Sequence, residues 1–548
     1  MKMKKRLVAL LLVFTTVITS FVGCGNDGKK TGSDGDQVLT VGVPQVASVT
    51  DWYDNAFTQY LEEQIGAKLE FVFFDVNASS MIKQFNLMVS AGEELPDVLW
   101  GFQGAGVDEM NTLGEDGYLL DLTDLIDQYA ENYKAGLKEL PKEEQERVKK
   151  QGTDITDGNF YGMPTIGTGT TDDNVNTMTY INQKWLNAVG KEVPTTIDEL
   201  YDVLKAFKEQ DPNGNGRADE IPICGTPSGI ATSGTATSYI MNAFVYTQRS
   251  NLDGFLLNVT DGKVWSPVVT DEWRQGITYI HKLMKEGLMS DLSFSLGSQG
   301  EYVSAVIGDG TAAQVGIFSA HPAAFLSTET DLLSEYIALP ALSDATGKGG
   351  YFVKEPNALN FGGYITADCE NQELAMKFLD CFYKDETYLA MRFGKEGVDW
   401  ERTEGTTWNG TDAIVKEVNT QAYMKGNSTW NKLSLGFLYR NGSMAVSDQT
   451  QTGIHGEYSR LLKETYDTMQ AGKTVKETIN NVVLNEKERD VNTKYWTAYA
   501  DYVDQFLAQC AVSEKNINDD SVWNAYLSEV ETFGLSELIK IYQAAYDR

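Results

Sequence analysis

The chain has 548 residues, enough for two large hydrophobic cores, and its apolar content of 42% is ordinary for a globular protein. Its formal net charge of −33 at pH 7 excludes a nucleic acid or an anionic membrane surface as the main partner. A soluble acidic surface is enough to explain this charge.

The first residues have the pattern of a bacterial secretion signal. A charged region that ends at Arg6 is followed by an apolar run from Leu7 to Val22. This run is shorter than the roughly 20 apolar residues of a spanning helix, and threonines interrupt it. It ends at Cys24 in the letters FVGC, which resemble a bacterial lipobox with Phe in place of the usual Leu. We therefore expect a signal peptide over residues 1–24, with Cys24 lipidated so that the protein is anchored to the outer face of the cell membrane.

Strands and helices are expected to alternate after a short tether. Residues 25–37 contain no apolar side chain and are expected to be a flexible tether. The hydrophobic pattern then predicts strands at 38–43, 68–75 and 97–100 and helices at 55–65 and 80–90. Such alternation favours an α/β fold with a mainly parallel sheet.

Two loops after the expected strands carry side chains suited to a sugar. Asp51 and Trp52 follow the first strand, and Trp100 lies at the end of the third. Ligands of parallel α/β sheets bind beyond the carboxyl ends of the strands. Aromatic faces pack against sugar C–H groups, and carboxylates accept hydrogen bonds from hydroxyls. We therefore predict that Asp51, Trp52 and Trp100 bind a ligand; for each Trp the alternative is a place in the core or at its rim.

A helix and an oxygen-rich loop lie in the middle of the chain. Thr196 and Glu199 have the spacing of a capping box, and the apolar stripe that follows indicates a core-facing helix. The loop at 211–220 has side-chain oxygens at alternate positions and matches the first part of an EF-hand calcium loop. The predicted calcium ligands are the side chains of Asp211, Asn213, Asn215 and Asp219 and the backbone carbonyl of Arg217.

The loop departs from the EF-hand at its twelfth position, where Pro222 stands in place of a bidentate glutamate. Glu220 or Asp219 are the candidates for the missing carboxylate oxygen. Asn-Gly pairs also favour turns without any metal, so a simple turn between helix and strand is the alternative. We expect a structural calcium ion, because the loop follows a helix end rather than the carboxyl end of a strand.

The same region carries a family resemblance. Trp185 to Glu199 read WLNAVGKEVPTTIDE, and Asp211 to Pro222 read DPNGNGRADEIP. Both stretches resemble family 1 extracellular solute-binding proteins, the lipoproteins that serve carbohydrate ABC importers in Gram-positive bacteria. The resemblance extends from the leader to about Trp400. It implies a two-lobe, periplasmic-binding-protein-like fold with a helix-rich C-terminal part. Such a protein closes about a hinge on a carbohydrate, here expected to be an oligosaccharide, and delivers it to an ABC permease.

The resemblance also indicates where the lobes meet. Residues 159–164 resemble the first crossing between lobes, in which Gly162 permits an unusual φ. Residues 308–322 resemble a buried strand and a ligand-facing loop, which adds Ser319 and His321 to the ligand candidates. The expected division is a first lobe of residues 38–160 and 333–385 and a second lobe of residues 161–332 and 386–548.

The C-terminal part continues the pattern of strands followed by helices. Strands expected at 336–340 and 361–366 should return the chain to the first lobe, and a helix is expected at 372–383. Helical apolar spacing recurs at 474–486 and 519–546. No proline follows Pro356, which suits long helices.

Catalytic patterns are weak. The histidines His281, His321 and His455 do not stand in pairs at metal-binding spacing, which argues against a zinc hydrolase. Ser80 to Lys83 match the S-x-x-K of penicillin-interacting enzymes, but a tetrad this short arises by chance, and the start of a helix explains the serine. We expect a binding protein that acts as a monomer and has no enzymatic activity.

Two other functions stay open at this point. The many Asp and Glu residues offer the two carboxylates of an extracellular glycoside hydrolase, although nothing fixes such a pair. A binding protein of this kind also suits a peptide or another solute.

The cysteines beyond the leader are expected to be buried thiols. Their spacing is irregular, and a chain of this size does not need disulfides for stability. They are Cys224, Cys369, Cys381 and Cys510.

Overall fold

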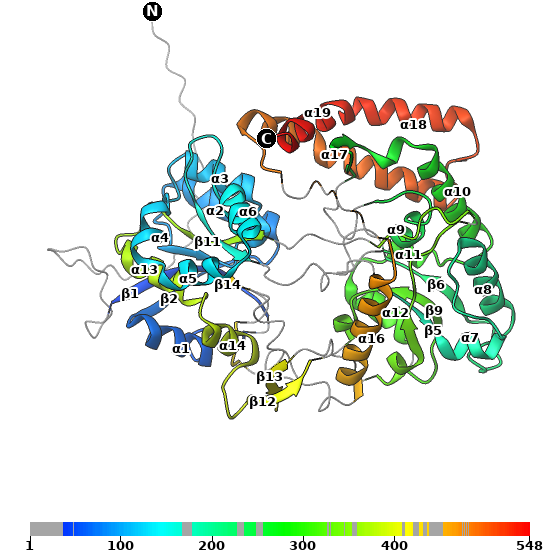
Figure 1. The fold of residues 1–548 in the computed structure, drawn as a ribbon, viewed down its shortest axis with the longest axis horizontal. Helices are drawn as coiled ribbons and strands as arrows, with labels where there is room; N and C mark the ends of the chain where they lie inside the picture. The colour runs from blue at the N-terminus through cyan, green and yellow to red at the C-terminus, as the bar shows by residue number, and fades with distance from the viewer. Residues whose placement is uncertain are drawn as a thin grey trace, which may run out of the picture.

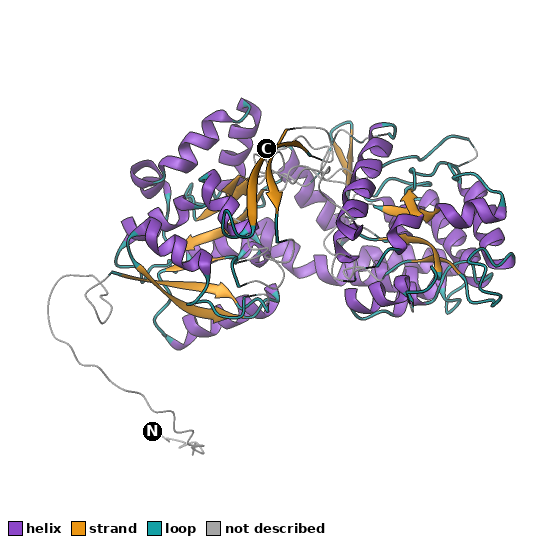
Figure 2. Cartoon of the chain, turned by 90° about the horizontal axis from the view of Figure 1, so that it is seen from below, coloured by secondary structure: helices purple, strands orange, loops and turns teal. Residues whose placement is uncertain are grey.

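The chain forms two lobes that lie side by side, each built on its own sheet with helices around it (Figures 1 and 2). Cys24, the expected signal peptide and nearly all of the expected tether lie outside the residues that are described. The computed structural model describes residues 37–166, 178–226, 235–247, 256–352, 359–407, 412–419, 427–430, 436–437 and 453–548, apart from residues 48, 309, 326, 327, 329, 345, 474, 476, 478, 480 and 481.

The first lobe is built on a six-stranded sheet in the order β14-β4-β11-β3-β1-β2. All its strands run in one direction except β11, which is antiparallel to both of its neighbours. The expected mainly parallel sheet is therefore confirmed. The strands are β1 (Val38–Pro44), β2 (Lys68–Phe74), β3 (Val98–Trp100), β4 (Gly162–Ile166), β11 (Leu359–Ile365) and β14 (Gly436–Phe437).

Helices cover both faces of this sheet. One face packs in a hydrophobic cluster with α1 and α13, and the other packs with α2 and α3. The helices of this lobe are α1 (Ala56–Ile65), α2 (Ala78–Ala91), η1 (Gln103–Ala105), α3 (Val107–Glu115), α4 (Thr123–Tyr129), α5 (Glu131–Glu139), α6 (Lys142–Gly152), α13 (Gln372–Cys381) and α14 (Asp385–Phe393), and a hairpin of β12 (Trp400–Thr406) and β13 (Asp412–Glu417) follows them.

The second lobe is built on a four-stranded sheet in the order β10-β5-β9-β6. β6 and β9 are parallel, and β5 is antiparallel to β9 and to β10. The carboxyl ends of β6 and β9 therefore meet at one edge of the sheet. The strands are β5 (Thr179–Asn182), β6 (Ile221–Cys224), β9 (Val315–Ser319) and β10 (Tyr336–Ala338), with a separate hairpin of β7 (Asn258–Thr260) and β8 (Lys263–Trp265).

Many helices surround the second sheet, and the C-terminal ones continue beyond it. In the described residues no helix has the length and apolar character that crossing a membrane requires. The helices are α7 (Gln183–Val189), α8 (Ile197–Glu209), α9 (Ala236–Met241), η3 (Pro267–Val269), α10 (Asp271–Lys285), α11 (Leu292–Ser295), α12 (Gln299–Ile307), η4 (Pro322–Phe325), η5 (Leu332–Glu335), α16 (Gly453–Gln470), α17 (Glu486–Ala511), α18 (Asp520–Thr532) and α19 (Leu535–Tyr546).

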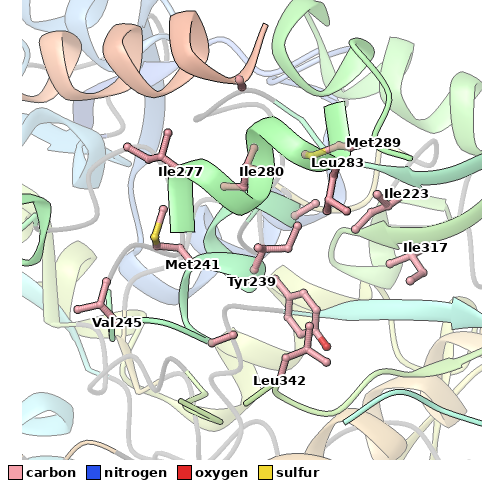
Figure 3. Close-up of a cluster of buried hydrophobic side chains, with 14 of the residues drawn as sticks. Ile223, Tyr239, Met241, Val245, Ile277, Ile280, Leu283, Met289, Ile317 and Leu342 are labelled. Atoms are coloured by element: carbon pink, nitrogen blue, oxygen red, sulfur yellow. The ribbon is translucent and has the colours of Figure 1, made fainter. Parts of the chain in front are cut away.

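The core of the second lobe joins the sheet to the helices on its face. Figure 3 shows Ile223 of β6 and Ile317 of β9 close to side chains of α9 and α10. The predicted helix α8 contributes the buried stripe of Leu200, Leu204 and Phe207, and its capping box is present as expected. Burial of these side chains fixes both β6 and the loop that precedes it.

The expected division into lobes is wrong at three strands of the two sheets. β4 was expected in the second lobe, but it lies in the first sheet. β10 was expected to return the chain to the first lobe, but it pairs with β5 in the second sheet. β14 was expected in the second lobe, but it pairs with β4 in the first sheet. Strand-forming residues specify an extended backbone but do not specify its partner, so a local pattern cannot assign a short strand to a sheet.

Gly162 does not have the hinge geometry that we expected. It lies inside β4, in the first sheet, and is not among the glycines with positive φ. A Cβ atom at this position would lie 2.6 Å from Cε1 of Tyr364, so glycine is required there for close packing of β4 against β11. The chain passes from the first sheet to the second between β4 and β5, through residues 167–177, which are outside the described residues.

The expected C-terminal helices are displaced or divided. The described residues at 482–485 are not helical, and α17 begins at Glu486, so the helix expected at 474–486 is wrong. The stretch expected to be helical at 519–546 forms α18 and α19, separated at Gly534, which has φ 90°. A side chain at Gly534 would be strained in this left-handed conformation, so the break is built into the sequence.

α17 contacts both lobes. Near its N-terminal end the buried guanidinium of Arg489 pairs with the carboxylate of Glu115 and, at 3.3 Å, with that of Asp154, both in the first lobe. Toward its other end the backbone carbonyl of Cys510 lies 2.9 Å from Nδ1 of His281 in α10. One continuous helix is thus fixed to the first lobe at its start and to the second lobe at its end.

No disulfide links the cysteines of the described residues, and each of them is buried, as expected; they are Cys224, Cys369, Cys381 and Cys510. Burial raises the pKa of the Cys224 thiol to about 12 and those of Cys381 and Cys510 to about 11. These thiols are therefore protonated at neutral pH and pack as small apolar side chains.

Candidate functional site

The loop between α8 and β6 has the backbone of a cation-binding loop. The carboxylate of Asp211 accepts the N–H of Gly216 at 3.0 Å, and Asn213 Oδ1 accepts the N–H of Asn215 at 2.9 Å. Asn215 Oδ1 in turn accepts the N–H of Arg217 at 2.7 Å. Gly216, at the position where an EF-hand requires glycine for its sharp turn, has φ 74°. The alternate side-chain oxygens are therefore held around one turn of backbone.

Two carboxylate oxygens of this loop are buried without a donor. They are Oδ1 of Asp211 and Oε1 of Glu220. Burial raises the pKa of Glu220, and the nearby carboxylates of Asp211 and Asp219 raise it further. A hydrogen bond from the Asn215 amide is the main cause that lowers the pKa of Asp219. Buried oxygens with mutual repulsion and no donor fit a hard cation such as calcium.

The donor set mixes carboxylates with amides and a carbonyl. Among the described residues, no group of three or more His, Cys, Asp or Glu side chains is arranged to hold a metal. This finding does not oppose the loop, because Asn213 and Asn215 supply amide oxygens. Such oxygen ligands suit calcium rather than zinc or another soft metal. Glu220 is a better replacement for the absent twelfth ligand than Asp219, because both Asn amides already donate toward Asp219.

Asp51, Trp52 and Trp100 lie near the carboxyl ends of β1 and β3, as expected, but only Asp51 is exposed. One carboxylate oxygen of Asp51 accepts the N–H groups of Tyr53 and Asp54 at 2.9 and 3.0 Å, so this side chain closes a turn. The exposed fraction of Trp52 is 4% and that of Trp100 is 0%. Neither indole presents a face to solvent in this conformation, so the expectation that they pack directly against a solute is not met here.

Trp430, from the opposite half of the chain, covers these two indoles. Its ring centroid lies 5.3 Å from that of Trp52 and 5.0 Å from that of Trp100, and its exposed fraction is 0%. Trp430 Nε1 donates to Oγ1 of Thr58 at 2.8 Å, and Asn55 Nδ2 donates to the carbonyl of Thr429 at 3.1 Å. We call Trp52, Phe57, Phe71, Trp100, Phe382 and Trp430 the aromatic cluster. It belongs to the hydrophobic cluster between one face of the first sheet and α1 and α13, and it buries Trp100 at the end of β3.

Ser319 and His321 lie at the carboxyl end of β9, where the resemblance placed them. Ser319 has an exposed fraction of 0%, and its hydroxyl is 2.8 Å from that of Thr179. The ring of His321 lies 6.0 Å from that of Tyr458 and keeps some exposed surface. Burial lowers the pKa of His321 to about 4, so its imidazole is neutral at pH 7. Ser319 is thus a core hydroxyl, whereas His321 stays at the surface of the strand end.

A cavity of about 300 Å³ opens at the carboxyl end of β6. Its wall is rich in hydroxyl groups and includes apolar side chains, one carboxylate and one amide. Figure 1 shows the helices that supply this wall, α9, α10, α11 and α17, in the second lobe. The lining residues are Thr226, Thr235, Thr237, Ser238, Met241, Thr247, Trp273, Ser293, Phe294, Asp504, Gln505, Leu507 and Ala508.

None of the residues predicted to bind a ligand lines this cavity. The available signal was the run from Thr226 to Ser238, which is rich in Ser, Thr and Gly and follows the strand residues at 221–223. Hydroxyl side chains next to a strand end suit a polyhydroxylated ligand. The contribution of α17 had no local signal, because its residues are far away in the sequence.

The chain is similar to known proteins over most of its length. The family model described as "Bacterial extracellular solute-binding protein" matches residues 46–388, more than half of the 548 residues. The fructooligosaccharide ABC transporter substrate-binding protein FusA of Streptococcus pneumoniae serotype 4 is 26% identical over 525 residues, with 91% of this chain and 88% of FusA covered.

Solved structures share the two-lobe fold. An extracellular solute-binding protein from Bifidobacterium longum subsp. infantis superposes with a TM-score of 0.77 at 23% identity, covering 94% of this chain and 99% of the other. An EF-hand mutant of S. pneumoniae FusA in complex with fructo-nystose superposes with a TM-score of 0.75 at 24% identity, covering 93% and 99%. These likenesses confirm the expected α/β, two-lobe class.

Proposed function

The chain belongs to the bacterial extracellular solute-binding proteins, and we propose that it captures an oligosaccharide between its lobes and delivers it to an ABC importer. The observation that carries this proposal is the similarity to FusA, which spans nearly the whole of both chains. The hydroxyl-rich cavity supports it, because such a wall suits a neutral polyhydroxylated solute.

Hinge closure is the mechanism that this fold supports. A solute that touches both lobes stabilises the closed form by its differential affinity for that form. In the second lobe the cavity and the neutral imidazole of His321 offer hydrogen-bonding partners. In the first lobe Asp51 is the exposed carboxylate near the carboxyl end of β1. Trp52, Trp100 and Ser319 act in this proposal by holding those surfaces in place.

We assign no catalytic step to the protein. The family and the relatives are binding proteins, and no observation on the described residues favours a glycoside hydrolase. The test is a thermal-shift screen against oligosaccharides, amino acids and peptides, followed by calorimetry and by chromatography of the best ligand after long incubation. An oligosaccharide should raise the melting temperature and be recovered intact. Cleavage of the sugar, or a response to peptides alone, would overturn the proposal.

The proposal also includes a bound calcium ion and a lipid anchor. Calcium bound by Asp211, Asn213, Asn215, Asp219 and the carbonyl of Arg217, with Glu220 as a further ligand, would neutralise the crowded carboxylates of the loop and fix the end of α8. FusA supports this assignment, since one of its structures is described as an EF-hand mutant.

The anchor assignment rests on the leader that ends at Cys24. The variant Cys24→Ala should lose the acyl chains and be largely absent from the membrane fraction. Mass spectrometry of the wild-type N-terminus tests this directly, and cleavage at another residue without acylation would refute it. The proposed monomeric state is checked by light scattering.

A further inference from the structure

The cavity at the end of β6 is small for a ligand pocket. Its volume of about 300 Å³ is at the lower end of the range for ligand pockets, roughly 300–1,000 Å³. Thr226 lies two residues beyond the last residue of β6, so the cavity is at the edge of the sheet where ligands of α/β folds bind. An oligosaccharide that reaches this end of the sheet can place a terminal unit inside.

One wall of the cavity offers hydroxyl groups with unused bonding capacity. Ser293 Oγ accepts the N–H of Gly225 at 2.8 Å, which leaves its own O–H to donate. Thr226 has an exposed fraction of 2%, and its Oγ1 has no hydrogen-bond partner. Leaving a buried hydroxyl unsatisfied is costly, so a ligand that supplies the missing bond would gain affinity here.

Another part of the wall is one face of α17. Asp504, Gln505, Leu507 and Ala508 all line the cavity, and their spacing places them on one side of a helix. Asp504 and Gln505 add a carboxylate and an amide, the groups that bind vicinal hydroxyls of a sugar. The helix is held rigidly at this point, because Tyr499 Oη lies 3.0 Å from Ser266 Oγ and Cys510 is fixed to α10. A fixed backbone is what an orienting carboxylate requires.

This wall lies outside the segment that the family model matches, although the similarity to FusA covers 91% of the chain. The match ends at residue 388, and α17 spans Glu486–Ala511. The hydroxyl wall comes from the matched part, since Thr226 and Ser293 both fall within it. The cavity is therefore a composite of a family segment and a C-terminal helix.

We propose that this cavity is an end pocket for one terminal sugar unit, and that Asp504 and Gln505 of α17 select that unit. The proposal rests on the proposed carbohydrate-binding function. It assigns the choice of sugar to the C-terminal helix and assigns the hydroxyl wall a supporting role.

The decisive experiment uses calorimetry of the full-length mature protein with fructo-, malto- and xylooligosaccharides, each from the disaccharide to the hexasaccharide. Asp504→Asn keeps the size of the side chain and removes its charge. It should weaken binding of the preferred sugar about tenfold, as expected for loss of a charge-assisted hydrogen bond. Asp501→Asn is the matched control, because Asp501 is exposed on the same helix and does not line the cavity. It should bind like the wild type.

A second variant, Ala508→Phe, fills the cavity. It should bind each sugar about as tightly as the wild type binds the sugar one unit shorter, because the terminal unit is excluded. Melting temperatures of all variants establish that they fold. If Ala508→Phe does not fold, Asp504→Asn alone decides the test. Wild-type affinity in Asp504→Asn, or in a folded Ala508→Phe, would overturn the end pocket while leaving the proposed function intact. Failure of the wild type to bind any of these sugars would overturn both.

Discussion

The two sheets end differently at their carboxyl edges. In the first lobe the aromatic cluster buries Trp100 at the end of β3, and Trp52, Trp100 and Trp430 leave almost no exposed ring surface. In the second lobe the corresponding edge of β6 opens into a cavity walled by hydroxyls. The carboxyl ends of the strands are therefore buried by aromatic rings in the first lobe and border a cavity in the second. One edge stabilises the lobe, and the other is available to a solute.

The difference follows from what long-range contacts bring to each edge. Trp430 adds a large apolar ring to residues that are already apolar, so burial of the whole set is favourable. α17 brings Asp504 and Gln505 to an edge made of Ser and Thr, and polar walls do not collapse on one another without satisfied hydrogen bonds. In the first lobe the ring of Trp430 completes a buried apolar cluster. In the second lobe the polar side chains of Asp504 and Gln505 leave a cavity.

The largest expected effect is on the aromatic cluster. Trp430→Ala should lower the free energy of unfolding by about 3–5 kcal/mol, because it removes a fully buried indole from among other rings. Denaturant unfolding measures this loss, and Trp430→Phe, which keeps a ring but not the bond to Thr58, should lose less. If Trp430→Ala kept its stability but no longer bound sugar, the first edge would also be a binding surface and the contrast would fail.

Removal of calcium should have the next largest effect. A metal bound only by the folded state stabilises it by about 2.7 kcal/mol at a hundredfold excess over Kd. EDTA and Asp211→Ala should therefore each lower the melting temperature. Sugar affinity should change little, since the loop precedes β6 and the cavity follows it. If neither EDTA nor Asp211→Ala changes the melting temperature, and calorimetry detects no calcium binding, the loop is a turn without a metal site.

A smaller effect should separate a core hydroxyl from a cavity hydroxyl. Ser319→Ala leaves the buried hydroxyl of Thr179 without its partner and should cost about 1–3 kcal/mol of stability, with sugar affinity unchanged. Thr226→Val is the matched variant, and it should cost almost no stability because its hydroxyl has no partner to lose. If Ser319→Ala keeps its stability but binds the sugar more weakly, Ser319 contacts the ligand directly.

A pH dependence of stability should come from His321, with no effect at neutral pH. Burial lowers its pKa to about 4 in the folded protein, whereas the unfolded chain binds the proton near 6.5. Its contribution to stability is therefore fully present above about pH 6.5 and is lost as the pH falls toward about 4. Unfolding curves across this window should be less pH-dependent for His321→Gln than for the wild type. Equal dependence in the two proteins would show that His321 is solvated.

Local sequence signals predicted the elements and the turn of the 211–220 loop well. The capping box of Thr196 and Glu199, the stripe of α8 and the strands at 38–43 and 68–75 are all present. Each of these signals depends on neighbours within one or two helical turns or one strand, so periodicity and spacing can identify it. The glycine and the alternating oxygens of the 211–220 loop are local in the same sense.

The candidate site could not be predicted from local patterns, because it is formed by contacts between residues that are far apart in the sequence. Trp52 and Trp100 have the chemistry of a sugar platform, and only Trp430, more than 300 residues away, shows that they are buried. The Ser and Thr residues after β6 became part of a cavity only through Asp504 of α17. A single sequence gives the residue types at an edge but not which distant segment reaches that edge.

α17 also determines how the lobes can move. It has 26 residues and is about 39 Å long at 1.5 Å per residue, with Arg489 paired in the first lobe and Asp504 in the cavity of the second. A rigid rod attached at both ends permits two kinds of motion. Either the lobes pivot about the Arg489 ion pairs, or those pairs break and α17 travels with the second lobe. In the first case a force applied at Asp504 would be transmitted through Arg489 to Glu115 and Asp154, and in the second case loss of these two ion pairs would free the first lobe from the helix.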